Sequence, residues 1–170
     1  MELPIDRETQ ESYQRYALAA EYRGAIIDWS VHVESVLWDL FLRLSEYQQG
    51  PTGRKGPPST TAMIDTLAGV FREQRRILAL DTDDPIVLSR RQLVSNLRHL
   101  NSLRRLLVHG QVDTGVNPES VVLKSKSDVA IFAWWSQKPV VITKRRVTST
   151  VRAAQQAAYG LGVEVGLAMR

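Results

Sequence analysis

Two arginines and a histidine close a leucine-rich segment, "NSLRRLLVHG", at residues 101–110. Arg104 and Arg105 carry permanent charges on planar guanidinium groups, which suit phosphate oxygens. His109 can carry a proton near neutral pH, because the ordinary pKa of histidine is about 6.5. Cleavage of RNA without a metal needs a 2′-hydroxyl near its own phosphate, a proton carrier and a cation for the developing charge. The three side chains match that chemistry.

The residues before this segment predict the helix that positions it. Asp84 can cap a helix that starts with Pro85 and ends at His109, and Gly110 suits the position just after the helix end. Four-three spacing predicts a polar stripe of Arg91, Ser95, Arg98, Ser102, Arg105 and His109. Within this stripe, Arg98 and Arg105 are candidate phosphate contacts and Ser102 is a candidate substrate-binding residue.

Arg104 interrupts the apolar seam of the same helix, which consists of Leu93, Leu97, Leu100 and Leu107. An unpaired buried charge is costly, so this arginine needs a partner. Glu34 is the lone charge in an apolar stripe of an earlier helix, and we predict that the two side chains approach each other. The alternative is that both extend to solvent at the edges of their stripes.

The composition of the chain fits one globular domain, predicted to span residues 1–170. Hydrophobic residues make up 44% of it, and it contains no cysteine, which excludes disulfides and thiolate metal sites. Residues 1–83 carry 9 Lys/Arg against 13 Asp/Glu, whereas residues 84–170 carry 13 against 5. This asymmetry indicates either an anionic partner, nucleic acid foremost, or an acidic half that folds against a basic half.

The sequence gives no sign of a membrane segment, a metal site or a cofactor. The N-terminus, "MELPIDRETQE", is acidic and lacks the apolar core of a secretory signal, and no apolar run approaches the ~20 residues of a membrane span. His32 lacks a second metal ligand at a suitable spacing, and His99 is expected at the surface. We therefore expect a soluble, cytoplasmic protein that needs no cofactor.

The periodicity of the chain predicts a mainly α fold, an antiparallel helical bundle. Helices are expected over residues 1–110, with a Gly- and Pro-rich loop at 48–59 and Ser59 as a helix cap. A small β-hairpin or three-stranded meander is expected at about 119–145, inserted before the last helix. That last helix, at about 148–169, carries small residues that would let it pack closely on a neighbour.

The β insertion combines basic and aromatic residues. "KSKS" at 124–127 and "KRR" at 144–146 flank Phe132, Trp134 and Trp135. Such a combination can bind single-stranded RNA through phosphate contacts and base stacking. The alternative is that the aromatic residues pack the small sheet onto a helix. The "TGRKG" stretch at 52–56 lacks the spacing of a phosphate-binding loop and is interpreted as a basic loop.

The stretch Arg104-Arg105-Leu-Leu-Val-His109-Gly resembles the HEPN domain family, helical bundles with a hallmark Arg-x4–6-His at the end of a long helix. The order of elements is also similar: an early helix with a glutamate among apolar residues, the motif helix, a variable insertion and a final helix. This similarity in order spans most of the chain, whereas the motif itself fixes two residues.

The resemblance implies a homodimer in which Arg and His from both protomers line one cleft. Many such proteins are metal-independent endoribonucleases of toxin–antitoxin, CRISPR-associated and phage-defence systems, so RNA and an antitoxin or other protein are the implied partners. Arg104 and His109 would be catalytic, with Glu34 as the orienting carboxylate. Position 105, often Asn, Asp or His in the family, is Arg in this chain. This difference favours one alternative, a non-catalytic module that binds RNA, a nucleotide or a protein; a helical scaffold is the third hypothesis.

Overall fold

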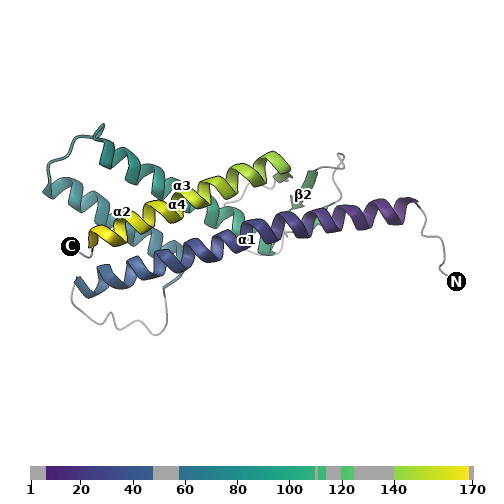
Figure 1. Cartoon of the computed structure of the whole chain (residues 1–170), viewed down its shortest axis with the longest axis horizontal. Helices are drawn as coiled ribbons and strands as arrows, with labels where there is room; N and C mark the ends of the chain where they lie inside the picture. The colour runs from purple at the N-terminus through teal and green to yellow at the C-terminus, as the bar shows by residue number, and fades with distance from the viewer. Residues whose placement is uncertain (1–6, 48–57, 110, 114–119, 125–139, 169–170) are drawn as a thin grey trace. The chain divides into compact units, whose positions relative to one another are not determined.

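The computed structural model describes residues 7–47, 58–109, 111–113, 120–124 and 140–168. Helices dominate these residues, as predicted (Figure 1), and this content is consistent with a helical bundle. The described elements are α1 (Arg7–Tyr47), α2 (Thr60–Ile77), α3 (Pro85–His109), β1 (Gln111–Asp113), β2 (Ser120–Lys124), β3 (Val140–Thr143) and α4 (Lys144–Ala168).

The chain forms two compact units, and the boundaries between them fall within α1, α3 and α4. The strand unit consists of Met1–Asp28 and Leu103–Val151, and it contains the three strands. The helical unit consists of Trp29–Ser102 and Arg152–Arg170. All of α2 and parts of α1, α3 and α4 belong to the helical unit.

The predicted starts of α2 and α3 are confirmed by their capping bonds. The Ser59 hydroxyl accepts a hydrogen bond from the Ala62 backbone N–H at 3.2 Å, just before α2. The Asp84 carboxylate accepts from the Ile86 N–H at 2.8 Å, and Pro85 is the first residue of α3. Each side chain pairs with one of the N–H groups that the first turn of a helix leaves unbonded.

The first helix is longer and more regular than the sequence indicated. A single helix, α1, covers 41 residues and continues through Gly24. Its buried residues are Ala19, Tyr22, Ile26, Ser30, Val33, Leu37 and Leu40. Four-three spacing over residues 22–44 predicts an apolar stripe of Tyr22, Ile26, Trp29, Val33, Val36, Leu40 and Leu44. Three of these residues are only half-buried, Trp29, Val36 and Leu44. The predicted stripe is therefore partly wrong, because Ser30 and Leu37 are buried where Trp29 and Val36 were expected.

Three short strands belong to the strand unit. Strand β2 pairs antiparallel with β1, with Val112 opposite Leu123, and with β3, with Val121 opposite Ile142. The start of α4 directly after β3 is four residues earlier than the predicted boundary at about 148. Strand β1 was not predicted, since three residues are too few to show an alternation. The predicted strand with Trp134 and Trp135 lies outside the described residues, as does the basic loop at 52–56.

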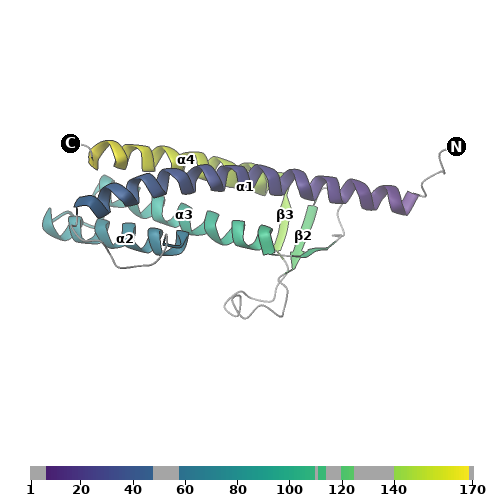
Figure 2. The same cartoon turned by 90° about the horizontal axis from the view of Figure 1, so that it is seen from below.

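Helices α2, α3 and α4 supply much of the apolar core of the helical unit (Figure 2). Buried residues include Met63, Ile64, Leu67 and Phe71 of α2, Leu93, Val94, Leu97 and Leu100 of α3, and Ala154, Ala157 and Leu161 of α4. The predicted close packing of α4 occurs at Gly160, where an added Cβ would lie 3.3 Å from Leu93 Cδ1. Gly162 and Gly166 have no such neighbour within 4 Å.

A charged pair lies at the edge of this apolar core. The Arg90 guanidinium of α3 donates two hydrogen bonds of 2.9 Å to the Glu164 carboxylate of α4. The two side chains are only 13% and 14% exposed. The guanidinium carbon also lies 4.6 Å from the centre of the Phe71 ring of α2, which is a cation–π contact. One arginine thus connects three helices.

None of the described helices combines the length and the apolar character that crossing a membrane requires.

Loss of one partner of the buried pair should strongly destabilise the fold. In Glu164→Ala, the Arg90 charge stays in the core without its carboxylate, and we expect the free energy of unfolding to fall by about 3–5 kcal/mol. Glu73→Ala is the matched control, because Glu73 pairs with Arg76 at the surface, where such a pair contributes at most about 1 kcal/mol. Urea unfolding followed by circular dichroism measures both. Equal losses in the two variants would contradict the assigned role of the buried pair.

Candidate functional site

The C-terminal turns of α3 hold the arginines of the Arg-x4-His motif. Arg104 and Arg105 are both half-buried, whereas Leu103, Leu106 and Leu107 are buried. The sequence placed Arg104 inside a single leucine seam. That placement is wrong in detail, because Leu103 and Leu106 share the buried face and Arg104 lies at its border. A border position lets the aliphatic stem pack while the guanidinium reaches a polar partner.

His109 is the last residue of α3, as predicted, and its side chain lies outside the described residues. The carbonyl groups at a helix C-terminus carry partial negative charge, which stabilises nearby cations. Arg104, Arg105 and His109 all lie in the last two turns of α3. This end of the helix therefore suits a cluster of positive charge.

Arg98 and Ser102 lie on the part of α3 that belongs to the helical unit. The Arg98 guanidinium forms an exposed ion pair of 2.9 Å with Asp65 of α2. One turn further, the Asn101 side chain donates to the Thr61 hydroxyl of α2 at 3.1 Å. Ser102 is half-buried. Arg98 thus links α3 to α2, and a phosphate would compete with Asp65 for its guanidinium.

Glu34, the predicted orienting carboxylate, is half-buried on α1 and contacts the start of α2. Its carboxylate accepts a short hydrogen bond from the hydroxyl of Thr60, the first residue of α2. Negative charge is favourable at a helix N-terminus, since the unpaired N–H groups there carry partial positive charge. In the helical unit, this glutamate therefore joins α1 to α2.

The predicted site residues divide between the two units. Glu34, Arg98 and Ser102 belong to the helical unit, whereas Arg104, Arg105 and His109 belong to the strand unit. Arg98 and Glu34 contact different residues of α2, Asp65 and Thr60 respectively. The pairing of Glu34 with Arg104 stays a prediction.

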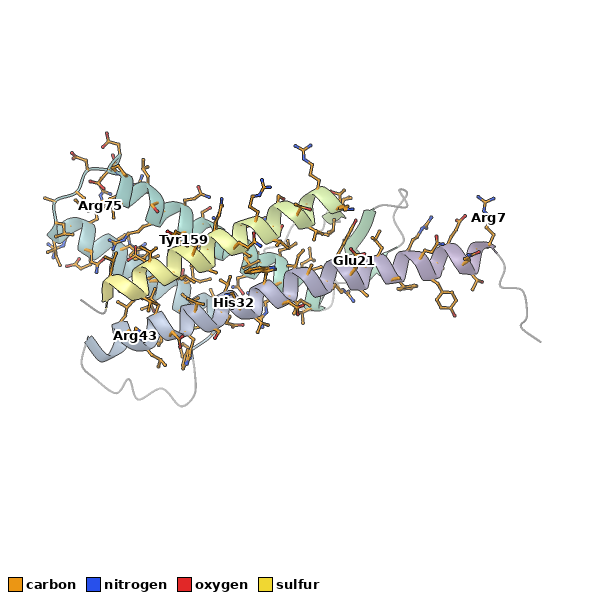
Figure 3. The ribbon with its side chains drawn as sticks, viewed as in Figure 1. Arg7, Glu21, His32, Arg43, Arg75 and Tyr159 are labelled. Carbon is orange, nitrogen blue, oxygen red and sulfur yellow. The ribbon has the colours of Figure 1, made fainter. Side chains whose placement is uncertain are left out.

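The other candidate residues from the sequence are exposed where they are described. His99 is exposed on α3, as predicted. His32 is exposed on α1 (Figure 3), and its ring forms a T-shaped contact with Trp29, with 5.7 Å between the ring centres. Lys144 and Arg145 are exposed at the start of α4, while Arg146 donates to the Val141 carbonyl at 3.2 Å. Among the described residues, no three His, Asp or Glu side chains gather in a group that could hold a metal ion.

A basic groove that the sequence did not indicate lies between α2 and α3. Its walls contain five arginines, Arg72, Arg75, Arg90, Arg91 and Arg98, and its volume is about 430 Å³. We name it the arginine groove. The signal was present in part, because Arg91 and Arg98 lie on the predicted polar stripe of α3. Nothing in the spacing of α2 alone showed that Arg72 and Arg75 would face the same groove.

No family model, curated protein or solved structure was found to match this chain.

Loss of the hydrogen bond at Glu34 should destabilise the helical unit. Thr60→Val keeps the shape of the side chain but removes the hydroxyl donor from a half-buried carboxylate. We expect the free energy of unfolding to fall by about 1–3 kcal/mol. Thr66→Val is the matched control on the same helix, because the exposed Thr66 hydroxyl bonds only to the backbone carbonyl of Ala62 among the described residues. Thermal unfolding of both variants tests this, and a control that loses as much stability as Thr60→Val would refute it.

Proposed function

We propose that this chain is a HEPN-like, metal-independent endoribonuclease that acts as a homodimer. The observation that carries the proposal is the C-terminal end of α3, where half-buried Arg104 and Arg105 precede the terminal His109. The helical architecture agrees with this assignment, and so does the basic character of residues 84–170. We place the protein in a toxin or phage-defence role, with an antitoxin or another protein as a candidate partner, and in the cytoplasm.

The proposed reaction needs a base, an acid and cationic groups. A neutral imidazole of His109 accepts the proton of a ribose 2′-hydroxyl, whose oxygen forms a bond to the adjacent phosphorus. The bond from phosphorus to the 5′-oxygen breaks, and a protonated imidazole donates a proton to that oxygen. In a symmetric dimer, the two imidazoles come from the two protomers. The products are a 2′,3′-cyclic phosphate and a 5′-hydroxyl.

The arginines stabilise the charge that develops during this step. The non-bridging phosphate oxygens gain negative charge in the transition state, and a guanidinium offers paired donors to them. Arg104 has this role in the proposal, and Arg105 and Arg98 hold neighbouring phosphates, with Ser102 as a further polar contact. Glu34 is proposed to orient the site. No cofactor is required by these steps.

A second function, RNA, nucleotide or protein binding without cleavage, is favoured by one specific residue. Arg105 occupies a position where the HEPN family often has a small polar residue or histidine. A second guanidinium there adds phosphate affinity but supplies no group for proton transfer at neutral pH, since arginine stays charged. Binding without cleavage would then be the activity of the chain.

Cleavage of RNA in the presence of EDTA tests the proposed function. We expect the wild type to cut a mixed RNA pool and to leave 2′,3′-cyclic phosphate ends. His109→Ala should lower the rate by about 10²–10⁴-fold, the usual contribution of one acid–base group. His32→Ala is the matched control, since His32 is exposed on α1, and it should cut at the wild-type rate.

Either of two results would contradict cleavage at this site. In one, His109→Ala cuts RNA as fast as the wild type. In the other, RNA stays intact with the wild type although the protein binds it, which supports the binding module instead. Arg104→Lys adds a further readout, because lysine keeps the charge but loses the paired donors, and we expect a lower rate with little change in RNA affinity.

A further inference from the structure

The arginine groove has an excess of positive charge. Of its five arginines, Arg90 pairs with Glu164 and Arg98 pairs with Asp65, which leaves three without a carboxylate partner among the described residues. These three are Arg72, Arg75 and Arg91. The lining contains no acidic residue, and its remaining members are small, apolar or neutral, such as Ala68, Val87, Val94 and Ser95.

Two of these arginines are held in place by backbone carbonyls. Arg75, at the end of α2 (Figure 3), donates to the Leu80 carbonyl at 3.1 Å, and Arg91 donates to the Thr82 carbonyl at 3.3 Å. A guanidinium has five N–H donors, so each of these bonds leaves most of the donors available. The connection between α2 and α3 thereby fixes one arginine on each wall.

The acidic residues near the groove do not neutralise it. Arg76 donates two hydrogen bonds to the Glu73 carboxylate, and this contact lowers the pKa of Glu73. Asp84 caps α3. Asp81 and Asp83 are exposed in the connection, and neither forms an ion pair with a described residue. None of the three groove arginines therefore forms an ion pair with these carboxylates.

We propose that the arginine groove binds the phosphodiester backbone of a single-stranded nucleic acid. Guanidinium groups recognise phosphate through paired hydrogen bonds. On α3, Arg91 can contact a phosphate directly, and Arg98, about two helical turns or roughly 10 Å further along, can contact another phosphate of the strand that replaces Asp65. Arg72 and Arg75 provide the same chemistry from the opposite wall.

The groove favours a polymer backbone over a free nucleotide. A nucleotide site needs a surface on which the base can stack or form hydrogen bonds. Phe71, the aromatic residue of the lining, is only 9% exposed and is covered by the Arg90 guanidinium at 4.6 Å. Binding is therefore through phosphates and independent of sequence. This inference does not rest on the proposed cleavage, because no groove contact requires His109.

The salt dependence of binding tests the groove. Binding of fluorescent oligouridine and oligothymidine of equal length is measured by anisotropy over a range of KCl concentrations in EDTA. The His109→Ala protein is used throughout, so that cleavage cannot interfere. Each phosphate contact contributes about 0.7 to the slope of log K against log salt for single strands. The slope is negative, because affinity falls as salt rises. The triple variant R72Q/R75Q/R91Q should reduce the magnitude of the slope by about 2. Its affinity should then change about 100-fold less than that of the parent protein between 0.1 M and 1 M salt.

Two further variants separate binding from folding and from net charge. Arg72→Gln removes an arginine that makes no hydrogen bond or ion pair with a described residue, so it should fold normally and lower the slope by about 0.7. The triple control R7Q/R43Q/R152Q removes three exposed arginines of α1 and α4 that do not line the groove. This control should keep the parental slope.

The outcomes decide the proposal and the nature of the ligand. Binding of both oligomers supports a site for any single strand, and binding of oligouridine alone supports an RNA site. Equal slopes for the groove and control triples overturn the proposal, as does an absence of binding to the His109→Ala protein. Equally tight binding of polyglutamate with the same groove dependence also overturns it, because the site would then recognise acidic polymers in general.

Discussion

The buried ion pair between Arg90 and Glu164 is the constraint on which the helical unit depends. Its two hydrogen bonds of 2.9 Å fix α3 to α4, and the contact of Arg90 with Phe71 adds α2. A charge in an apolar core is tolerated only with a well-placed partner, so the pair restricts how the three helices can pack. The same pair holds one arginine of the groove, Arg90, and Asp65 holds a second, Arg98, whereas Arg72, Arg75 and Arg91 have no carboxylate partner among the described residues.

The polar contacts of α2 extend this arrangement to the other helices. Glu34 joins α1 to the first residue of α2, and Arg98 and Asn101 join α3 to Asp65 and Thr61. These contacts lie along the N-terminal half of α2. The hydrogen bonds that Arg75 and Arg91 donate to backbone carbonyls lie just beyond its C-terminal end, at Leu80 and Thr82. Polar side chains near both ends of α2 are therefore committed to packing, whereas Arg72, which lies between them, lines the arginine groove.

Much of the fold could be predicted from the sequence, because its strongest signals are local. Ser59, Asp84 and Pro85 marked helix starts through bonds that span two or three residues. The apolar positions of α1 were harder, since Ser30 and Leu37 displaced Trp29 and Val36 from the core. A serine at a core position has no signature in hydrophobic periodicity.

The candidate site shows the same limit. A lone charge in an apolar stripe was the signal applied to Glu34 and Arg104. It applies equally to Arg90, which lies between Val87 and Val94, and to Glu164, which follows Leu161 by one turn. Spacing shows that such a charge needs a partner, but only the tertiary fold shows which one. The arginine groove was not predictable for this reason, because it forms only when α2 and α3 pack together.

Arginine-selective labelling with phenylglyoxal, read by mass spectrometry with and without single-stranded RNA, tests the central claim most directly. That claim is that RNA contacts α3 and its neighbour α2 through arginines. The His109→Ala protein should show slower modification of Arg72, Arg91 and Arg105 when RNA is present, with Arg7 and Arg152 unchanged. Modification of Arg72, Arg91 and Arg105 at the same rate with and without RNA would contradict the account.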